Sequence, residues 1–232
     1  MIQIRHVWLF FLVLVYSISV NAQVKEFDIG LFVGTSQYNG DVNMSKAYYS
    51  PHVSGGVFVK QVFNYHYSAR YSVAYGELKG FDKDFDNAFQ QLRNHSFRDN
   101  NVLEFSAVCE FNFFEVTPQR DEKNISPYLV GGLGVFFADE LDWHQSFNFP
   151  MGVGVKFRIA SRVEMGIDWV FRKTFTDKLD KMETLGEGYR EYKQISFDTT
   201  NDWYSIASIT FMICFLNPQS PCPVYYKKPY EL

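Results

Sequence analysis

The chain has 232 residues, of which 19% are aromatic and 21% charged, and its formal net charge at pH 7 is −4. This length suits one domain, and a negative net charge without a basic run argues against a nucleic-acid partner. The many aromatic residues alternate with polar ones instead of forming long apolar blocks, which indicates a protein rich in β-strands.

Residues 1–22 differ in character from the rest of the chain. Arg5 and His6 precede an apolar run from Val7 to Val20. This run is shorter than the roughly 20 residues of a spanning helix, so it is interpreted as a secretory signal peptide, with a membrane anchor as the alternative. We expect residues 23–215 to form one barrel domain and residues 216–232 to form a tail.

Apolar side chains recur at every second position in about eight stretches of the chain. The clearest is a hairpin over residues 147–175, and the others are residues 26–38, 52–60, 69–79, 103–113, 128–137 and 203–215. Strands of roughly 9 to 11 residues cross a bilayer at a tilt, and no helical pattern separates these strands. The predicted fold class is therefore all-β, an eight-stranded antiparallel up-and-down transmembrane β-barrel with a periplasmic C-terminal tail.

Side-chain volume predicts which face of this barrel meets lipid. Eight strands leave an interior only just wide enough for side chains or one small ligand, and the apolar face carries too many large aromatic residues to fit there. A secreted ligand carrier with its apolar face inward is therefore disfavoured. We expect the opposite face to form a paired charge network in the lumen, from Arg70, Glu104, Glu110, Lys156, Arg158, Glu164, Asp168 and Arg172.

The predicted connections alternate in length. They are long after the first, third and seventh strands and short after the second and sixth, and the third is expected to run from Lys79 to about Arg98. Outer-membrane barrels have long extracellular loops and short periplasmic turns, and an even strand count places both termini in the periplasm. We therefore expect the chain in the cell outer membrane, in contact with lipid and lipopolysaccharide.

Four segments resemble the PorG-like family, which comprises outer-membrane barrels of the type IX secretion apparatus of Bacteroidota. They are residues 37–41, 127–134, 172–180 and 201–204, and they include Thr-Phe-Thr-Asp-x-Leu-Asp and Asn-Asp-Trp-Tyr. The resemblance spans essentially the whole mature chain, although the third extracellular loop is short and Lys178 stands where the family has an aromatic residue. It implies a non-enzymatic part that links the outer membrane to a periplasmic ring of a lipoprotein, PorK, and its soluble partner, PorN.

The tail carries candidate partner-binding residues, which are Cys222, Pro223, Tyr225 and Tyr226. Its prolines keep it out of the sheet, and its aromatic residues suit docking on a partner; a disordered tail is the alternative. Disulfides form in exported proteins. Cys222 is therefore expected to pair with Cys214 or with a cysteine of a periplasmic partner, and a free Cys222 is the remaining alternative.

Two further expectations concern chemistry. No Cys or His spacing is typical of zinc, and no helix follows the glycines of residues 131–134, so we expect neither a metal nor a cofactor. His95 and Ser96 are the only neighbouring pair that suits an outer-membrane lipid-modifying enzyme, an acyltransferase or deacylase, and no carboxylate is spaced to orient the histidine. A general structural or adhesive barrel is the other alternative function.

Overall fold

The structure is a computed structural model that describes residues 26–40, 42–43, 46–64, 66–86, 90–91, 94–114, 125–141, 144–160, 162–176, 179 and 202–214. Its strands are β1 Glu26–Asn39, β2 His52–Val62, β3 Tyr67–Phe81, β4 Ser96–Asn112, β5 Ile125–Ala138, β6 Gln145–Ala160, β7 Val163–Thr174 and β8 Trp203–Ile213. Two single-turn 3-10 helices, η1 Asp82–Asp84 and η2 Asp139–Leu141, follow β3 and β5. No helix in the described ranges is long and apolar enough to cross a membrane.

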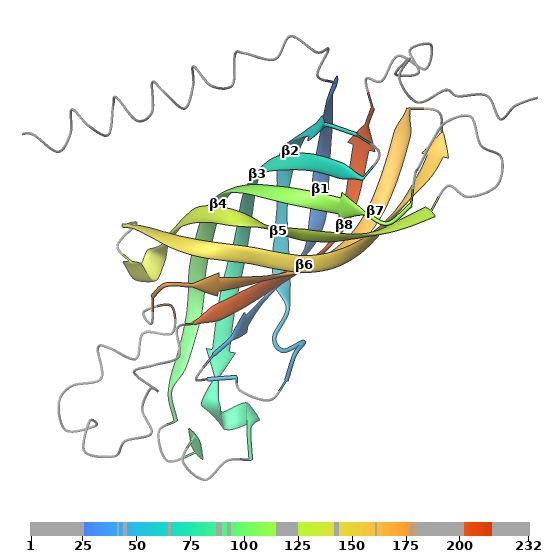
Figure 1. Cartoon of the computed structure of the whole chain (residues 1–232). Helices are drawn as coiled ribbons and strands as arrows, with labels where there is room; N and C mark the ends of the chain where they lie inside the picture. Colours follow the sequence, from blue (N-terminus) through green and yellow to red (C-terminus); the bar gives the residue numbers. More distant parts are fainter. Residues whose placement is uncertain are drawn as a thin grey trace, which may run out of the picture.

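The strands form one closed barrel (Figure 1). Each strand pairs antiparallel with the next in the chain, and β1 pairs with β8, from Ile29 opposite Ile213 to Asn39 opposite Trp203. Closure leaves no strand edge unpaired, which a barrel needs if its backbone is to lie in lipid. The predicted eight-stranded antiparallel up-and-down barrel is confirmed.

Alternate side chains of each strand point outward and are apolar. Val53 is 79% exposed and Leu133 is 68% exposed, whereas their strand neighbours Ser54 and Gly134 point inward. Large exposed apolar residues recur in the same way on all eight strands. An apolar wall around a charged interior is the pattern of a membrane-spanning barrel, so the predicted orientation of the two faces is confirmed.

The interior is filled by side chains, and glycines make room for the largest of them. A Cβ atom at Gly30 would lie 2.3 Å from the ring of Phe58, and one at Gly154 would lie 2.4 Å from the ring of Tyr128. Both rings are buried, at 4% and 3% exposure. An aromatic ring can therefore lie inside a narrow eight-stranded barrel where the neighbouring strand has no side chain.

The two ends of the barrel differ. At one end, here called the short-turn end, residues 63–66 join β2 to β3 and residues 161–162 join β6 to β7, while the longer connection from β4 to β5 is the exception there. Glu26 and Cys214, the outermost described residues of the chain, lie at this end as well. The opposite end, here called the long-loop end, carries the connections after β1, β3, β5 and β7. The predicted long connections after the first, third and seventh strands and short ones after the second and sixth are confirmed.

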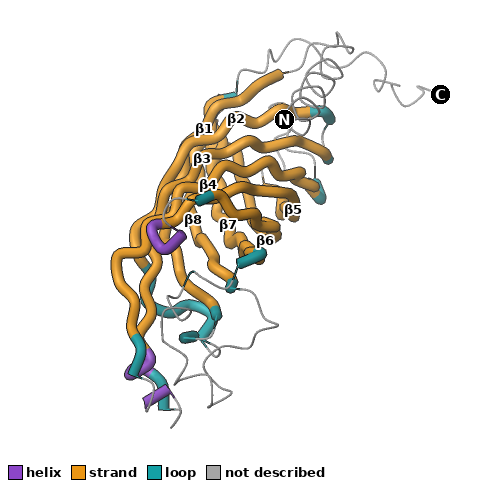
Figure 2. The backbone as a smooth tube through the Cα atoms, turned by 90° about the vertical axis from the view of Figure 1, so that its left-hand side faces the viewer, coloured by secondary structure: helices purple, strands orange, loops and turns teal. Residues whose placement is uncertain are grey.

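One predicted boundary is wrong. Lys79 and Arg98, expected to limit a long loop, both lie within strands, because β3 continues to Phe81 and β4 begins at Ser96. This extension, residues 77–81 with residues 96–101, is here called the β3–β4 arm, and it projects beyond the neighbouring strands at the long-loop end (Figures 1 and 2). Apart from Phe81, its outward residues are polar because they lie beyond the apolar wall, so the apolar alternation ends before the strands do.

Candidate functional site

All eight charged residues predicted for the lumen lie inside the barrel. Their side chains are at most 10% exposed. Those that share a strand are an even number of positions apart, so they face the same way. The structure divides the eight residues into two clusters at different heights, and the hydrogen bonds and ion pairs described for one cluster share no residue with those described for the other.

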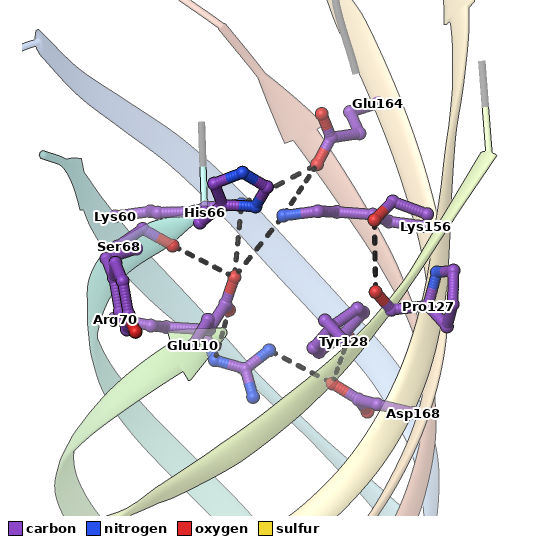
Figure 3. A network of polar contacts seen from close by, with 12 residues as sticks. Lys60, His66, Ser68, Arg70, Glu110, Pro127, Tyr128, Lys156, Glu164 and Asp168 are labelled. Atoms are coloured by element: carbon purple, nitrogen blue, oxygen red, sulfur yellow. Dashed lines mark hydrogen bonds and ion pairs between the residues drawn. The ribbon is translucent and has the colours of Figure 1, made fainter. Parts of the chain in front are cut away.

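The first group, here called the short-turn cluster, centres on two glutamates that are shared by several cations (Figure 3). The Glu110 carboxylate forms ion pairs with Lys60 at 3.2 Å, Arg70 at 3.3 Å and Lys156 at 3.6 Å. The Glu164 carboxylate forms ion pairs with Lys60 at 3.6 Å, with Lys156 at 3.9 Å and with Nη2 of Arg158 at 3.5 Å. Because each glutamate bridges several cations, the cluster ties β2, β3, β4, β6 and β7 together across the lumen.

Asp168 extends this cluster toward the middle of the barrel. Its Oδ2 accepts Arg70 Nη1 at 3.0 Å and the hydroxyl of Tyr128 at 3.0 Å, and its Oδ1 accepts the hydroxyl of Ser208. Both carboxylate oxygens are thus satisfied, as a buried charge requires.

The second group, here called the long-loop cluster, converges on one oxygen of Glu104. Oε2 accepts Arg172 Nε at 2.7 Å, Asn148 Nδ2 at 3.1 Å and the hydroxyl of Tyr204. Arg172 Nη1 also donates to the carbonyl of Val170 at 2.8 Å. The cluster joins β4, β6, β7 and β8 at a level that the short-turn cluster does not reach.

Among the side chains that the structure describes, the inward cations and carboxylates of the strands are equal in number. Five cations, Lys60, Arg70, Lys156, Arg158 and Arg172, face five carboxylates, Asp28, Glu104, Glu110, Glu164 and Asp168. Lys60 and Asp28 were absent from the predicted network, although both occupy inward positions in the same alternation. Together these ten described groups carry no net charge that would attract a counter-ion or a charged substrate.

Two small cavities lie inside the described part of the barrel. A cavity beside Lys60, Lys156 and Thr210 has a volume of about 20 Å³, and one beside Glu104, Ser36 and Gly76 has a volume of about 10 Å³. A single water molecule needs roughly 10–15 Å³ of such space. Neither cavity can therefore hold an organic ligand, and neither forms a water-filled path.

The long-loop end is closed by hydrogen bonds between segments that are far apart in the sequence. The hydroxyl of Tyr38 donates to Asp202 Oδ1, and Asp202 Oδ2 accepts the backbone N–H of Leu179 at 3.0 Å. Asn100 Nδ2 donates to the carbonyl of Leu179 at 2.8 Å, and Thr174 Oγ1 donates to the carbonyl of Asp202 at 2.7 Å. The side chain of Leu179 is fully buried in the apolar cluster that fills this mouth.

Most residues of these contacts lie in three of the four segments singled out in the sequence, although Asn100 lies outside them. Tyr38 belongs to residues 37–41, Leu179 to residues 172–180, and Asp202 to residues 201–204, while Arg172 and Tyr204 of the long-loop cluster belong to the last two. Residues that are far apart in the sequence thus meet at the long-loop end, where their contacts hold the strands and the loop before β8 together.

The cysteines of the described ranges are both free. Cys109 is exposed on the outer wall, whereas Cys214 is buried among Phe32, Phe58 and Met212 inside the barrel. The pairing expected for Cys222 stays a prediction. The tail residues Cys222, Pro223, Tyr225 and Tyr226, like the expected signal peptide, lie outside the described residues.

His95 and Ser96 lie where the connection from β3 ends and β4 begins, and Ser96 pairs with Phe81 of β3. The backbone N–H of His95 donates to Asp82 Oδ2 at 2.9 Å, and the backbone N–H of Asp82 donates to the carbonyl of His95 at 2.9 Å. A carboxylate therefore lies beside His95, which the sequence spacing did not reveal, and its bond to the backbone closes the turn. Among the described residues, no group of three His, Cys, Asp or Glu side chains could hold a metal ion.

Comparison with protein families adds an assignment. Residues 5–225 match the family model described as "Domain of unknown function (DUF6089)". The chain belongs to the DUF6089 family. A search of curated proteins finds no match to this DUF6089 chain.

Solved barrel structures resemble this DUF6089 chain at low sequence identity. Neisserial surface protein A is 13% identical with a TM-score of 0.48, and 82% of this chain and 97% of that chain are covered. A major outer membrane protein from Thermus thermophilus is 12% identical with a TM-score of 0.47, covering 83% and 100%. The attachment invasion locus protein Ail of Yersinia pestis is 11% identical with a TM-score of 0.45, covering 83% and 100%. The membrane-spanning character of the DUF6089 barrel follows from its own apolar wall.

Proposed function

We propose that the chain is a non-enzymatic outer-membrane component of the type IX protein secretion apparatus, which anchors a periplasmic ring of PorK-like and PorN-like proteins to the membrane. The proposal that the protein is not an enzyme rests on its interior, whose described part is filled by side chains and balanced in charge. A barrel without a ligand cavity or a water path in its described part acts through its surfaces, that is, by binding.

The outer membrane is the compartment that suits this barrel. Its wall exposes apolar side chains on every strand, so the barrel needs lipid around it, and closed barrels are the β-structures that lipid accommodates. The long connections after β1, β3 and β7 are gathered at one end, and the two shortest turns lie at the other. By the general asymmetry of outer-membrane barrels, the short-turn end faces the periplasm.

The type IX assignment is supported by the family resemblance and by the places that its residues occupy. Tyr38, Leu179, Asp202 and Tyr204 make the hydrogen bonds and apolar contacts that hold the long-loop end together. A protein that shares these positions keeps the same mouth and interior, and therefore presents its ends to partners in the same way.

We further propose that residues 216–232 bind the ring, with Pro223, Tyr225 and Tyr226 as contact residues and Cys222 as the site of a disulfide to a partner cysteine. Two facts support the intermolecular bond. Cys109 lies on the lipid-facing wall, and Cys214 lies inside the barrel. Neither thiol is presented to a segment outside the barrel, which favours a partner over the barrel itself as the source of a second cysteine.

The test is co-purification of the ring lipoprotein and its soluble partner with the full-length barrel from native membranes. We expect deletion of residues 216–232 to abolish co-purification, and Cys222→Ser to abolish a band that shifts on reduction, while Cys109→Ser changes neither. All variants should keep the heat-modifiable migration of a folded barrel. Unchanged co-purification after the deletion would overturn the ring-anchoring role and leave a general structural barrel.

Two measurements address the other functions. Planar bilayers containing the purified barrel should show no conductance above that of the lipid alone, because the paired interior leaves no continuous path. Lipid A from cells that lack the protein should have an unchanged mass spectrum. A loss of deacylated or acylated species that returns with the wild-type gene but not with His95→Ala would favour the enzyme.

A further inference from the structure

The outer face of the β3–β4 arm gathers three cations that the interior clusters do not include. A β-bulge between Leu78 and Gly80 lets residues 98 and 99 of β4 oppose Lys79 of β3. Lys79 and Arg98 therefore lie across from each other on adjacent strands, and Lys83 follows in η1. Like charges placed opposite each other across two strands destabilise the pair unless a counter-charge lies between them.

Two of these cations, Lys83 and Arg98, lie over the aromatic ring of Phe81. The guanidinium carbon of Arg98 lies 5.0 Å from the ring centre of Phe81, and Lys83 Nζ lies 5.5 Å from the same centre. Within the described part of the chain, neither Arg98 nor Lys83 forms an ion pair, whereas Lys79 Nζ pairs with Glu77 at 2.7 Å. Arg98 and Lys83 are both exposed, so their donors can reach an external anion.

The height of the patch suggests where that anion comes from. Below the arm, the last large apolar side chains on the outer faces of these strands are Tyr75 and Leu103, which mark the edge of the apolar wall. Lys79 lies four residues beyond Tyr75, which at a rise of about 3.3 Å and a tilt of about 45° corresponds to roughly 9 Å along the membrane normal. The polar headgroup layer begins at the hydrocarbon edge and is about 5–8 Å deep. Long Lys and Arg side chains cover the difference.

We propose that the outer face of the arm, formed by Lys79, Lys83 and Arg98 around Phe81, binds the phosphate groups of a phosphorylated glycolipid in the adjacent leaflet. Arg98 offers the planar fork that suits two phosphate oxygens, and the lysines act as point charges. Arg98 and Lys83 each contact the phenyl ring of Phe81, which positions both cations before the lipid arrives. This inference rests on the outer-leaflet position of the long-loop end in the proposed function.

The test is native mass spectrometry of the full-length barrel in detergent with purified, phosphorylated lipid A as the probe. We expect one-to-one lipid adducts with the wild type, and an apparent affinity lower by about tenfold in the double variant Lys83→Gln with Arg98→Gln, as for loss of two charge-assisted contacts. Lys173→Gln is the matched control, because Lys173 also lies over an aromatic ring, that of Trp203 at 5.6 Å, but on β7. Its affinity should equal that of the wild type.

Three comparisons decide the outcome. Lipid A whose phosphates have been removed should bind the wild type no better than it binds the double variant. Inorganic phosphate at millimolar concentration should not displace the lipid; displacement would overturn the lipid as the source and leave a free-phosphate site. Equal affinity of the wild type and the double variant would overturn the site itself. Because no ring protein is present in the assay, its failure would leave the co-purification test of ring anchoring unaffected.

Discussion

The hydroxyl of Tyr38, in the first strand, donates its hydrogen to the carboxylate of Asp202, which lies 164 residues further along the chain at the start of the last strand. The same carboxylate holds the backbone of Leu179, whose side chain plugs the mouth of the barrel. Asp202, directly before β8, is thus hydrogen-bonded both to β1 and to the loop between β7 and β8.

Tyr38→Phe removes this hydrogen bond without removing the ring. We expect the free energy of unfolding to fall by about 1–3 kcal/mol, because a buried carboxylate loses a donor. The measurement is urea unfolding of the barrel in detergent, followed by heat-modifiable migration. Tyr75→Phe is the control, since its hydroxyl donates to Asn101 at an exposed site and should change stability by less than about 0.5 kcal/mol. Equal effects of the two substitutions would contradict the role given to Asp202.

Glu104→Ala leaves Arg172 buried without its carboxylate. We expect a loss of about 3–5 kcal/mol, the range for breaking a buried ion pair by removing one partner. The double variant Glu104→Leu with Arg172→Leu should unfold at higher urea than Glu104→Ala, because no uncompensated charge remains. A double variant less stable than Glu104→Ala would contradict this expectation, because it would mean that Arg172 finds another partner in the interior of Glu104→Ala.

The two interior clusters should act independently. Glu110→Gln and Glu104→Gln affect separate sets of contacts, so their effects on the free energy of unfolding should add to within about 0.5 kcal/mol. Glu110→Gln and Lys60→Met, by contrast, remove two ends of one contact of 3.2 Å and should be non-additive by about 0.5–3 kcal/mol. Strong coupling between Glu110 and Glu104 would show that the clusters communicate.

Tyr49 links the loop after β1 to the β3–β4 hairpin through a bond of 2.6 Å to Asp84 Oδ2. Burial, and then the nearby Asp84 carboxylate, raise the pKa of Tyr49. The raised pKa means that the folded state favours the protonated phenol. Its stabilising effect is therefore complete below the ordinary tyrosine value of about 10 and is lost as the pH rises above it.

This effect is measurable in the ultraviolet absorbance of tyrosinate during a titration with base. We expect the wild type to show a component that ionises later than ordinary tyrosine, and Tyr49→Phe to lack it. Tyr49→Phe should also remove part of the loss of stability at high pH. Titration curves that coincide for the two proteins would argue against a buried phenol in this loop.

The sequence predicted much of the fold because alternation is a local property. Whether Glu110 or Phe111 points inward depends only on odd and even positions along one strand, so the closed barrel and its charged interior could be predicted from spacing. The position of a residue along the barrel axis depends on register across several strands, which no single segment encodes. For this reason the division of the interior into two clusters could not be predicted.

Cross-strand complementarity was hidden for the same reason. Phe58 and Tyr128 are inside the barrel because Gly30 and Gly154 lie beside them on neighbouring strands. The alternation alone places a bulky ring and a glycine inward without saying that they meet. The β3–β4 arm was missed on different grounds, since the apolar signal that marks a strand ends at the membrane edge while the hydrogen-bonded ladder continues.

The pairing of β1 with β8 has a consequence for how the protein is made. The first strand cannot find its partner until residues 203–213 are available, so the sheet has an open edge at every earlier stage of chain delivery. Contacts between such distant segments form slowly because a long loop must close first. The barrel therefore keeps an unpaired strand edge until its last segment is available, and a chain truncated before β8 should fail to close.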